Sequence, residues 1–325
     1  METRRLGRTG RDVGVVGLGA WQLGADWGAV DESDAIAVLR AAIDGGVTFI
    51  DTADVYGDGR SERLVGEVLK SAEGLTVATK MGRRVEQVPE NYTPANFRAW
   101  NDRSRRNLGV DTIDLVQLHC PPTPVYSNDE VFDALDTLVD EGRIAAYGVS
   151  VETCAEALTA IARPNVASVQ IILNAFRLKP LDKVLPAAQA AGVGIIARVP
   201  LASGLLSGKY DENTTFGPDD HRTYNRHGEA FDVGETFAGV EFGTGLEAVR
   251  RLAPAVPAGA TMAQFALRWI LDQPGVSTVI PGARSPQQVA GNLAAATLSP
   301  LSEEQLAIVQ ATYDDLIRPQ VHDRW

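Results

Sequence analysis

The feature that most constrains the fold of this chain is a repeated unit in which a short apolar run ends at an ionisable residue. Three such runs end at Asp51, Lys80 and His119, and Tyr56 follows the first of them on the next loop. In a closed barrel of parallel strands, all the strand ends on one face converge. We therefore expect these four side chains to meet in one pocket.

Eight apolar runs alternate with segments of helical periodicity. The strands are expected at residues 15–19, 47–51, 75–79, 113–118, 145–149, 169–173, 194–199 and 277–280. The first helix is expected from Ser33 to Asp44, because apolar residues recur there at helical spacing before a Gly-Gly pair. Strands that alternate with helices favour a parallel sheet covered by helices, and eight such units predict a closed α/β structure, the (β/α)8 TIM barrel.

Three segments fall outside this repeat. Residues 4–13 predict an N-terminal hairpin, and Ser302–Leu316 predicts an extra C-terminal helix that lies on the barrel. Tyr210–Thr244 is polar, rich in glycine and too long for an ordinary connection, so we interpret it as a mobile lid or a partly disordered insertion. With 325 residues and 45% hydrophobic content, a single barrel domain over residues 1–325 is expected.

Charge and composition exclude several classes of function. The formal net charge of -12 disfavours nucleic acid and anionic membranes, which bind clustered basic residues. No apolar run approaches the roughly 20 residues that cross a bilayer, and no apolar signal core follows Met1, so a cytoplasmic location is expected. Cys120 and Cys154 have neither disulfide nor metal-ligand spacing, and we expect no metal site. The sequence carries no signal for an oligomeric state.

The ionisable strand ends resemble the aldo-keto reductase superfamily, and the resemblance runs from Arg4 almost to the end of the sequence. Asp51, Tyr56, Lys80 and His119 match the catalytic tetrad of that family, although each of the four taken alone also has an ordinary structural explanation. The resemblance implies an NADPH-dependent oxidoreductase that reduces aldehydes or ketones to alcohols, reversibly, with a small-molecule carbonyl compound as its substrate.

The resemblance also implies a role for each member of the tetrad. Tyr56 would act as the general acid and base, and the ammonium group of Lys80 would lower the pKa of its phenol. Asp51 would keep Lys80 protonated and positioned, and His119 would donate a hydrogen bond to the substrate oxygen. Trp21 matches a position at which the family lines its substrate pocket with an aromatic ring. Three residues on adjoining loops are further candidates for the substrate pocket: Val55, Met81 and Arg83.

Segments late in the chain resemble the family's cofactor-binding segments. Gln170 and Asn174 resemble the strand that binds the nicotinamide carboxamide, and Ser150 matches another such contact, although Val151 replaces the usual asparagine. The loop 200–209 resembles the one that covers the pyrophosphate, where small residues let backbone N–H groups approach phosphate oxygens. The residues assigned to NADP in this way are Ser150, Gln170, Arg198, Pro200, Leu201, Ser203, Gly204, Leu205, Lys209, Gly282, Arg284, Gln288 and Asn292.

The roles of two arginines among these residues are not settled by the resemblance. Arg198 stands where many family members stack an aromatic ring on the nicotinamide. Its planar guanidinium group can also stack on the nicotinamide, or it can bind a phosphate or an acidic substrate. A third possibility is an ion pair at the end of the barrel. Arg284 suits a ribose 2′-phosphate, because its fork makes paired charge-assisted bonds, whereas Gly282 replaces the lysine of some relatives. No Gly-x-Gly-x-x-Gly opens a helix after a strand, which argues against a Rossmann domain.

Two other functions are compatible with part of the sequence. A Schiff-base lyase would use Lys80 but would leave the loop 200–209 and the Arg284 motif unexplained. A regulatory subunit would bind the cofactor with little turnover; the resemblance allows this, because the family includes auxiliary channel subunits that retain the cofactor site. Because a barrel supports many chemistries, only the site can decide between these functions.

Overall fold

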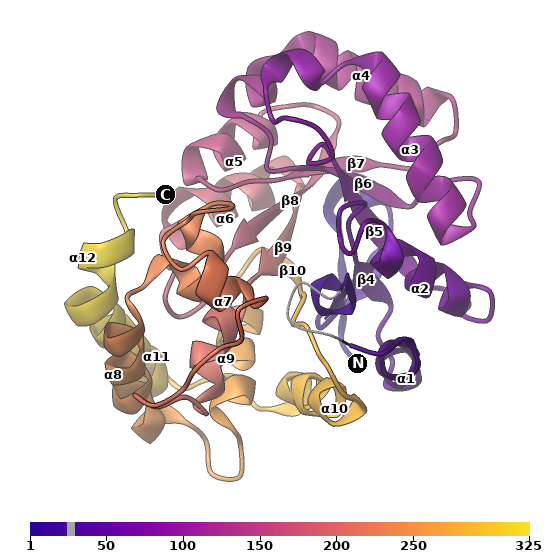
Figure 1. The fold of residues 1–325 in the computed structure, drawn as a ribbon. Coiled ribbons are helices and arrows are strands. Elements are labelled where there is room, and N and C mark those ends of the chain that lie inside the picture. Colours follow the sequence, from indigo (N-terminus) through magenta and orange to yellow (C-terminus); the bar gives the residue numbers. More distant parts are fainter. Residues whose placement is uncertain (25–29) are drawn as a thin grey trace.

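The centre of the computed structural model, which describes residues 1–24 and 30–325, is a closed ring of eight parallel strands (Figure 1). These strands are β3 (Leu18–Gly19), β4 (Phe49–Asp51), β5 (Thr76–Met81), β6 (Leu115–His119), β7 (Tyr147–Ser150), β8 (Val166–Ile172), β9 (Gly194–Arg198) and β10 (Val276–Val279). Each strand pairs with the next one, and parallel bridges from Val16 to Val279 and from Gly19 to Gly282 close the ring. The predicted (β/α)8 barrel is confirmed.

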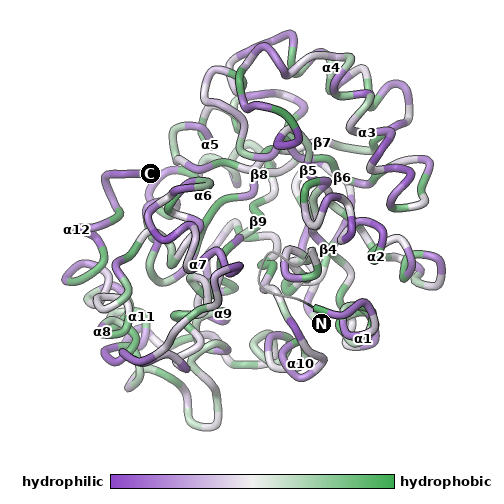
Figure 2. The backbone as a smooth tube through the Cα atoms, in the orientation of Figure 1, coloured by the Kyte–Doolittle hydropathy of each residue, from purple (hydrophilic) through white to green (hydrophobic). Residues whose placement is uncertain are grey.

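Helices surround the strands, and hydrophilic and hydrophobic residues alternate along their outer turns (Figure 2). The helices are α1 (Glu32–Asp44), α2 (Arg60–Leu69), α3 (Pro94–Leu108), α4 (Asp129–Asp140), α5 (Cys154–Ile161), α6 (Pro180–Ala191), α7 (His221–Tyr224), α8 (Phe242–Leu252), α9 (Met262–Leu271), α10 (Pro286–Ala294), α11 (Glu303–Thr312) and α12 (Arg318–Val321). The expected C-terminal helix is α11, which packs on α8. None of the described helices is long and apolar enough to cross a membrane.

The predicted N-terminal hairpin is also present and closes one end of the barrel. Strands β1 (Thr3–Arg5) and β2 (Asp12–Gly14) pair antiparallel, and the turn between them lies against β8 and β9. Gly7 in this turn has a φ of 48°, and a Cβ atom there would lie 2.1 Å from the carbonyl oxygen of Ala167. Only glycine allows this approach.

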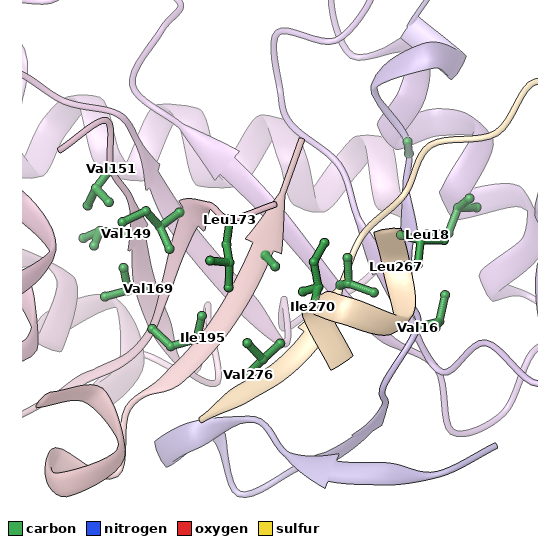
Figure 3. Close-up of a cluster of buried hydrophobic side chains, with 14 of the residues drawn as sticks. Val16, Leu18, Val149, Val151, Val169, Leu173, Ile195, Leu267, Ile270 and Val276 are labelled. Carbon is green, nitrogen blue, oxygen red and sulfur yellow. The ribbon is translucent and has the colours of Figure 1, made fainter. Parts of the chain in front are cut away.

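Two hydrophobic cores result from the alternation of side chains along the strands. The outer core lies between strands and helices; Figure 3 shows Val149, Val169, Ile195 and Val276 from four neighbouring strands with Leu267 and Ile270 of α9. The inner core fills the hairpin end of the barrel and consists of Leu6, Val13, Phe49, Ala78, Leu115, Ile196 and Ile280. Two positions after Phe49, Ala78 and Leu115, the same strands carry the polar residues Asp51, Lys80 and Gln117. These side chains also face the interior of the barrel, at the end opposite the hairpin.

The segment between β9 and α8 differs from its interpretation as a partly disordered insertion. It contains α7 and two short 3-10 turns, Val233–Glu235 and Phe237–Gly239, and its residues His221, Asn225 and Phe237 are buried. The Asn225 amide donates to the Thr236 hydroxyl at 3.1 Å, and its oxygen accepts two backbone N–H groups. The structure thus contradicts partial disorder, whereas the alternative of a mobile lid stays a prediction. The contacts that order the segment leave no periodic pattern in the sequence, so the sequence could not indicate them.

Asp54, on the loop after β4, generates a prediction about stability. Its carboxyl group is completely buried, and no described donor bonds to its oxygens with good geometry. Burial, together with the negative charge of Glu62, raises its pKa from 3.8 to about 7, although Arg84 and Arg103 lower it. The folded protein therefore binds this proton more tightly than the unfolded chain does, and stability should fall as the pH rises from about 4 to about 7.

We predict that Asp54→Asn removes this decline, which amounts to a few kcal/mol at most. Urea unfolding at several pH values measures the slope, and the exposed Asp44→Asn substitution serves as the control. A variant with the slope of the wild type would show that Asp54 is ionised in the folded protein.

Candidate active site

The C-terminal ends of the barrel strands bring four polar side chains together inside the ring. Asp51 ends β4, Lys80 lies near the end of β5, and His119 ends β6. Gln170 lies on β8, on the opposite side of the barrel. Each stands two residues after an inward-facing residue of the same strand, so strand alternation alone directs these side chains to the interior.

The centre of the site is a buried ion pair between Lys80 and Asp51, which are 1% and 2% exposed. The ammonium group also donates to the carbonyl oxygen of Thr52 at 2.9 Å and to the hydroxyl of Tyr56 at 3.2 Å. The other carboxylate oxygen of Asp51 accepts amide N–H groups from Gln117 at 2.9 Å and from Gln170 at 2.8 Å. These bonds compensate for the loss of water around both charges.

The structure changes one expectation about Tyr56. Burial raises its pKa and outweighs the lowering effect of Lys80, and the negative charges of Asp51 and Glu235 raise it further. The phenol therefore carries its proton at neutral pH. Burial also opposes the charge on Lys80, but attraction to Asp51 and Tyr56 raises the pKa of Lys80 overall.

Among the described residues, His119 and Trp21 are aromatic neighbours of Tyr56. The ring of His119 meets that of Tyr56 edge-on, with centroids 5.9 Å apart, and the Trp21 ring lies nearly parallel to it at 6.0 Å. Burial and the positive charges of Arg83, Lys80 and Arg198 hold the pKa of His119 well below its usual value of 6.5. The imidazole is thus neutral at neutral pH and can donate a single N–H bond.

A cavity of 640 Å³ extends from this cluster to the start of α10. The predicted residues that line it are Trp21, Asp51, Tyr56, His119, Ser150, Gln170, Arg198, Pro200, Leu201, Ser203, Gly204, Lys209, Gly282, Arg284, Gln288 and Asn292. Lys80 lies behind this wall, bonded to two of its members. Residues far apart in the sequence are therefore assembled around one space.

Besides Lys80, four predicted residues and Asn174 are not among the residues that line this cavity. Leu205 and Met81 are each 1% exposed and belong to the hydrophobic core, and Val55 lies half-buried on its loop. Arg83 binds two glutamates instead. Asn174 donates to the carbonyl oxygen of Val199 at 2.9 Å. It thus supports the backbone before the loop 200–209 rather than facing the cavity.

The loop 200–209 contains three consecutive residues with a left-handed backbone conformation. Ala202, Ser203 and Gly204 all have positive φ values, of 47°, 53° and 97°. The Ser203 hydroxyl donates to the carbonyl oxygen of Glu235 and accepts from the amide of Phe237, both at 3.0 Å. The side chain of Ser203, a residue of the cavity wall, thus ties the loop to the insertion.

At the other end of the cavity, α10 begins directly after Arg284. The backbone N–H of Arg284 donates to the side-chain oxygen of Gln288 at 2.7 Å, and the Asn292 amide donates to the carbonyl oxygen of Gly282 at 3.2 Å. A Cβ atom at position 282 would lie 2.0 Å from the side-chain oxygen of Gln22. The glycine thus leaves room for Gln22, which reaches across from the 3-10 turn after β3.

Several lining residues were missed by the sequence reasoning: Gln22, Cys120, Tyr210, Arg222, Glu235, Thr261 and Gln264. The Thr261/Gln264 pair had a readable signal, because Thr-x-x-Gln before an apolar run is a capping box, and it does cap α9. Three others, Tyr210, Arg222 and Glu235, belong to the insertion. Its backbone is irregular, so the sequence there has no periodic pattern that would indicate which side chains face the cavity.

Arg198 occupies the site as a member of an ion-pair cluster. It binds Glu152 at 2.8 Å and Glu235 at 3.6 Å, and Arg83 contacts the same two carboxylates. Cys120 lies close enough to both glutamates for the three to hold a metal ion, within 4.8 Å. However, the two guanidinium groups already neutralise these carboxylates, and their positive charge opposes a cation.

Comparisons with known proteins show the family to which this barrel belongs. A model described as the aldo/keto reductase family matches residues 15–314. The aldo-keto reductase YhdN of Bacillus subtilis is 31% identical, covering 98% of this chain and 97% of that protein. The solved glycerol dehydrogenase AKR11B4 of Gluconobacter oxydans is 32% identical with a TM-score of 0.77, over 98% and 96% of the two chains. An aldo/keto reductase from Klebsiella pneumoniae, solved with NADP and acetate, is 26% identical with a TM-score of 0.70, over 96% and 95%.

The buried ion pair predicts a large stability effect for Lys80→Met. The substitution leaves the Asp51 carboxylate buried without its counter-charge, and breaking such a pair costs on the order of 3–5 kcal/mol. Urea unfolding at neutral pH measures the loss.

The matched control is Lys70→Met, which removes an exposed lysine from its 2.8 Å pair with Glu67 and should change stability little. Equal effects of the two substitutions would contradict the central role of the Lys80–Asp51 pair.

Proposed function

This chain belongs to the aldo/keto reductase family, and from that premise we propose that it is an NADPH-dependent oxidoreductase that reduces aldehydes or ketones to alcohols, reversibly. The single observation that carries the proposal is the contact of the Tyr56 hydroxyl with the Lys80 ammonium group, 3.2 Å away, at the wall of a cavity that also holds His119. The solved Klebsiella relative with NADP supports the choice of cofactor.

The residues around the cavity fit a long nicotinamide dinucleotide. The lining includes Ser150, Gln170 and Arg198 together with Tyr56, residues of the loop 200–209, and Arg284, Gln288 and Asn292 at α10. The positive φ values of the loop leave its amide groups in the kind of concave arrangement that accepts phosphate oxygens. When bound, NADPH would supply the hydride, which no amino-acid side chain can donate.

In this proposal, Tyr56 delivers the proton. Its raised pKa keeps the phenol protonated at neutral pH, so it can protonate the oxygen of a carbonyl compound as negative charge develops there. Lys80 stabilises the phenolate that remains, and Asp51 holds Lys80 in place. The neutral imidazole of His119 donates an N–H bond to the same substrate oxygen, which orients the carbonyl group.

The environment of Lys80 argues against the lyase alternative. A Schiff-base nucleophile must be an unprotonated amine, whereas the pKa of Lys80 is raised because Asp51 and Tyr56 outweigh the effect of burial. Its three bonds to Asp51, Thr52 and Tyr56 also hold the ammonium group away from the cavity. The regulatory-subunit alternative is tested by activity, since tight NADPH binding without turnover over a panel of aldehydes, ketones, sugars and pyridoxal would favour it.

We predict that Tyr56→Phe lowers turnover by about 10²–10⁴-fold and leaves NADPH binding nearly unchanged, because the lost hydroxyl acts on the substrate. The absorbance of NADPH follows the reaction, and fluorescence titration follows binding. Tyr224→Phe, on α7, removes a hydroxyl from a partly exposed residue outside the cavity lining and serves as the control. Turnover at the wild-type rate by a folded Tyr56→Phe variant would refute the proposed mechanism.

Arg284 should decide between NADPH and NADH, because the 2′-phosphate is the only charge that distinguishes them. A hydrogen bond to a charged group contributes roughly 1.5–3 kcal/mol, so Arg284→Ala should weaken NADPH about ten- to a hundredfold and spare NADH. Titrating both cofactors by fluorescence gives the two affinities.

Arg40→Ala, on the exposed face of α1, is the control for the loss of a positive charge. If the ratio of the two affinities is the same in Arg284→Ala and in the wild type, Arg284 does not bind the 2′-phosphate and acts only near the start of α10.

A further inference from the structure

We propose that Glu235, carried by the insertion between β9 and α8, is a specificity-determining residue that makes the substrate pocket favour uncharged carbonyl compounds over those that carry a carboxylate. This inference rests on the proposed carbonyl reduction. It concerns the part of the substrate away from the reacting carbonyl, and none of the four tetrad residues takes part in it.

Glu235 binds both arginines at this end of the barrel. One of its carboxylate oxygens lies 3.2 Å from Nη2 of Arg83, and the other lies 3.6 Å from Nη1 of Arg198. Arg198 lines the cavity, as does Glu235 itself, whereas Arg83 lies on the loop after β5. The glutamate thus occupies the position from which a ligand carboxylate would bridge the two guanidinium groups.

The second acid of the cluster completes the charge balance. Glu152 binds Arg198 at 2.8 Å and Arg83 at 3.3 Å, so two formal negative charges face two formal positive ones. A guanidinium fork is the protein's best partner for a carboxylate, but here each fork already contacts both Glu152 and Glu235. A substrate carboxylate that approached this cluster would have to lose its hydration without gaining a guanidinium group whose charge is not already balanced, which is unfavourable in a buried site.

The negative charge of Glu235 also acts at the reacting group. It is one of the charges that raise the pKa of Tyr56, after burial and Asp51. A charge that is felt at the phenol is felt by any substrate bound beside that phenol. Glu235 therefore offsets part of the attraction that Arg83 and Arg198 would exert on a substrate carboxylate.

The insertion holds Glu235 firmly in this position. The side chain is 8% exposed, the carbonyl oxygen of Glu235 accepts from the Ser203 hydroxyl, and its backbone N–H donates to Asp232 at 3.0 Å. Asp232 in turn accepts the indole N–H of Trp325 at 2.9 Å, and the guanidinium group of Arg177 lies 3.8 Å from the centroid of that indole ring. The carboxylate therefore has little freedom to turn away when a substrate enters.

The test compares two aldehydes of similar length, 4-oxobutanoate and pentanal, with NADPH at about pH 8, where carboxylates are normally ionised. Glu235→Gln keeps the size of the side chain and one acceptor oxygen but removes its charge. We expect kcat/KM for 4-oxobutanoate to rise about tenfold, mainly through a lower KM, and kcat/KM for pentanal to change less than about threefold. Glu229→Gln makes the same change on an exposed part of the insertion and should alter neither value.

Two further variants test the same inference by removing the positive charge of Arg83. Adding Arg83→Gln to Glu235→Gln restores the charge balance and should abolish the gain with 4-oxobutanoate. Arg83→Gln alone leaves an excess negative charge and should lower the preference for 4-oxobutanoate below that of the wild type. This single variant keeps the test available if Glu235→Gln does not fold.

Equal changes for both aldehydes in Glu235→Gln would overturn the inference and assign Glu235 a structural role only. If the wild-type protein reduces neither aldehyde, binding tests Glu235 on its own, and the proposed function fails only if the whole panel of aldehydes, ketones, sugars and pyridoxal also gives no turnover. For the binding test, butanoate and butanamide are titrated by the quenching of tryptophan fluorescence. Tighter binding of butanoate by Glu235→Gln, with butanamide unchanged, would support the inference, and no difference between the two ligands would refute it.

Discussion

The ion pair between Lys80 and Asp51 is the interaction on which the rest of the site depends. Two charges buried in the barrel are tolerable only when each has its partner and the remaining polar atoms are bonded, which Thr52, Gln117 and Gln170 accomplish. Because those partners come from different strands, the pair constrains the barrel ends to a single arrangement. Its position also places a permanent ammonium group beside the phenol of Tyr56.

The barrel can hold such charges because its two ends are different. The N-terminal hairpin and the inner apolar residues, among them Phe49 and Leu115, close one end. Two residues further along the same strands, the inward positions become Asp51 and Gln117, and they face the cavity end. Because every second residue of a strand faces inward, a change from apolar to polar residues along each strand gives the barrel an apolar, closed end and a polar end that carries the site, as in other parallel barrels.

The insertion adds a negative charge, that of Glu235, to the end of the barrel that carries the site. It supplies Glu235 to a cluster with Arg83, Glu152 and Arg198, and it is fastened to the loop 200–209 through the Ser203 side chain. The cofactor loop and the insertion are consequently parts of one bonded unit. A movement of one relative to the other must break the hydrogen bonds of the Ser203 side chain.

The sequence by itself determined the barrel, the hairpin and the meeting of Asp51, Tyr56, Lys80 and His119, because the period of the apolar runs fixes which residues face inward at each strand end. Only the tertiary structure decided the direction of the Tyr56 pKa, since burial and several charges from distant segments compete there. It also decided the roles of Leu205 and Glu235, one packed in the core and the other turned to the arginines. Irregular loops carry no period, so the side chains that they bring together depend on contacts between residues far apart in the chain.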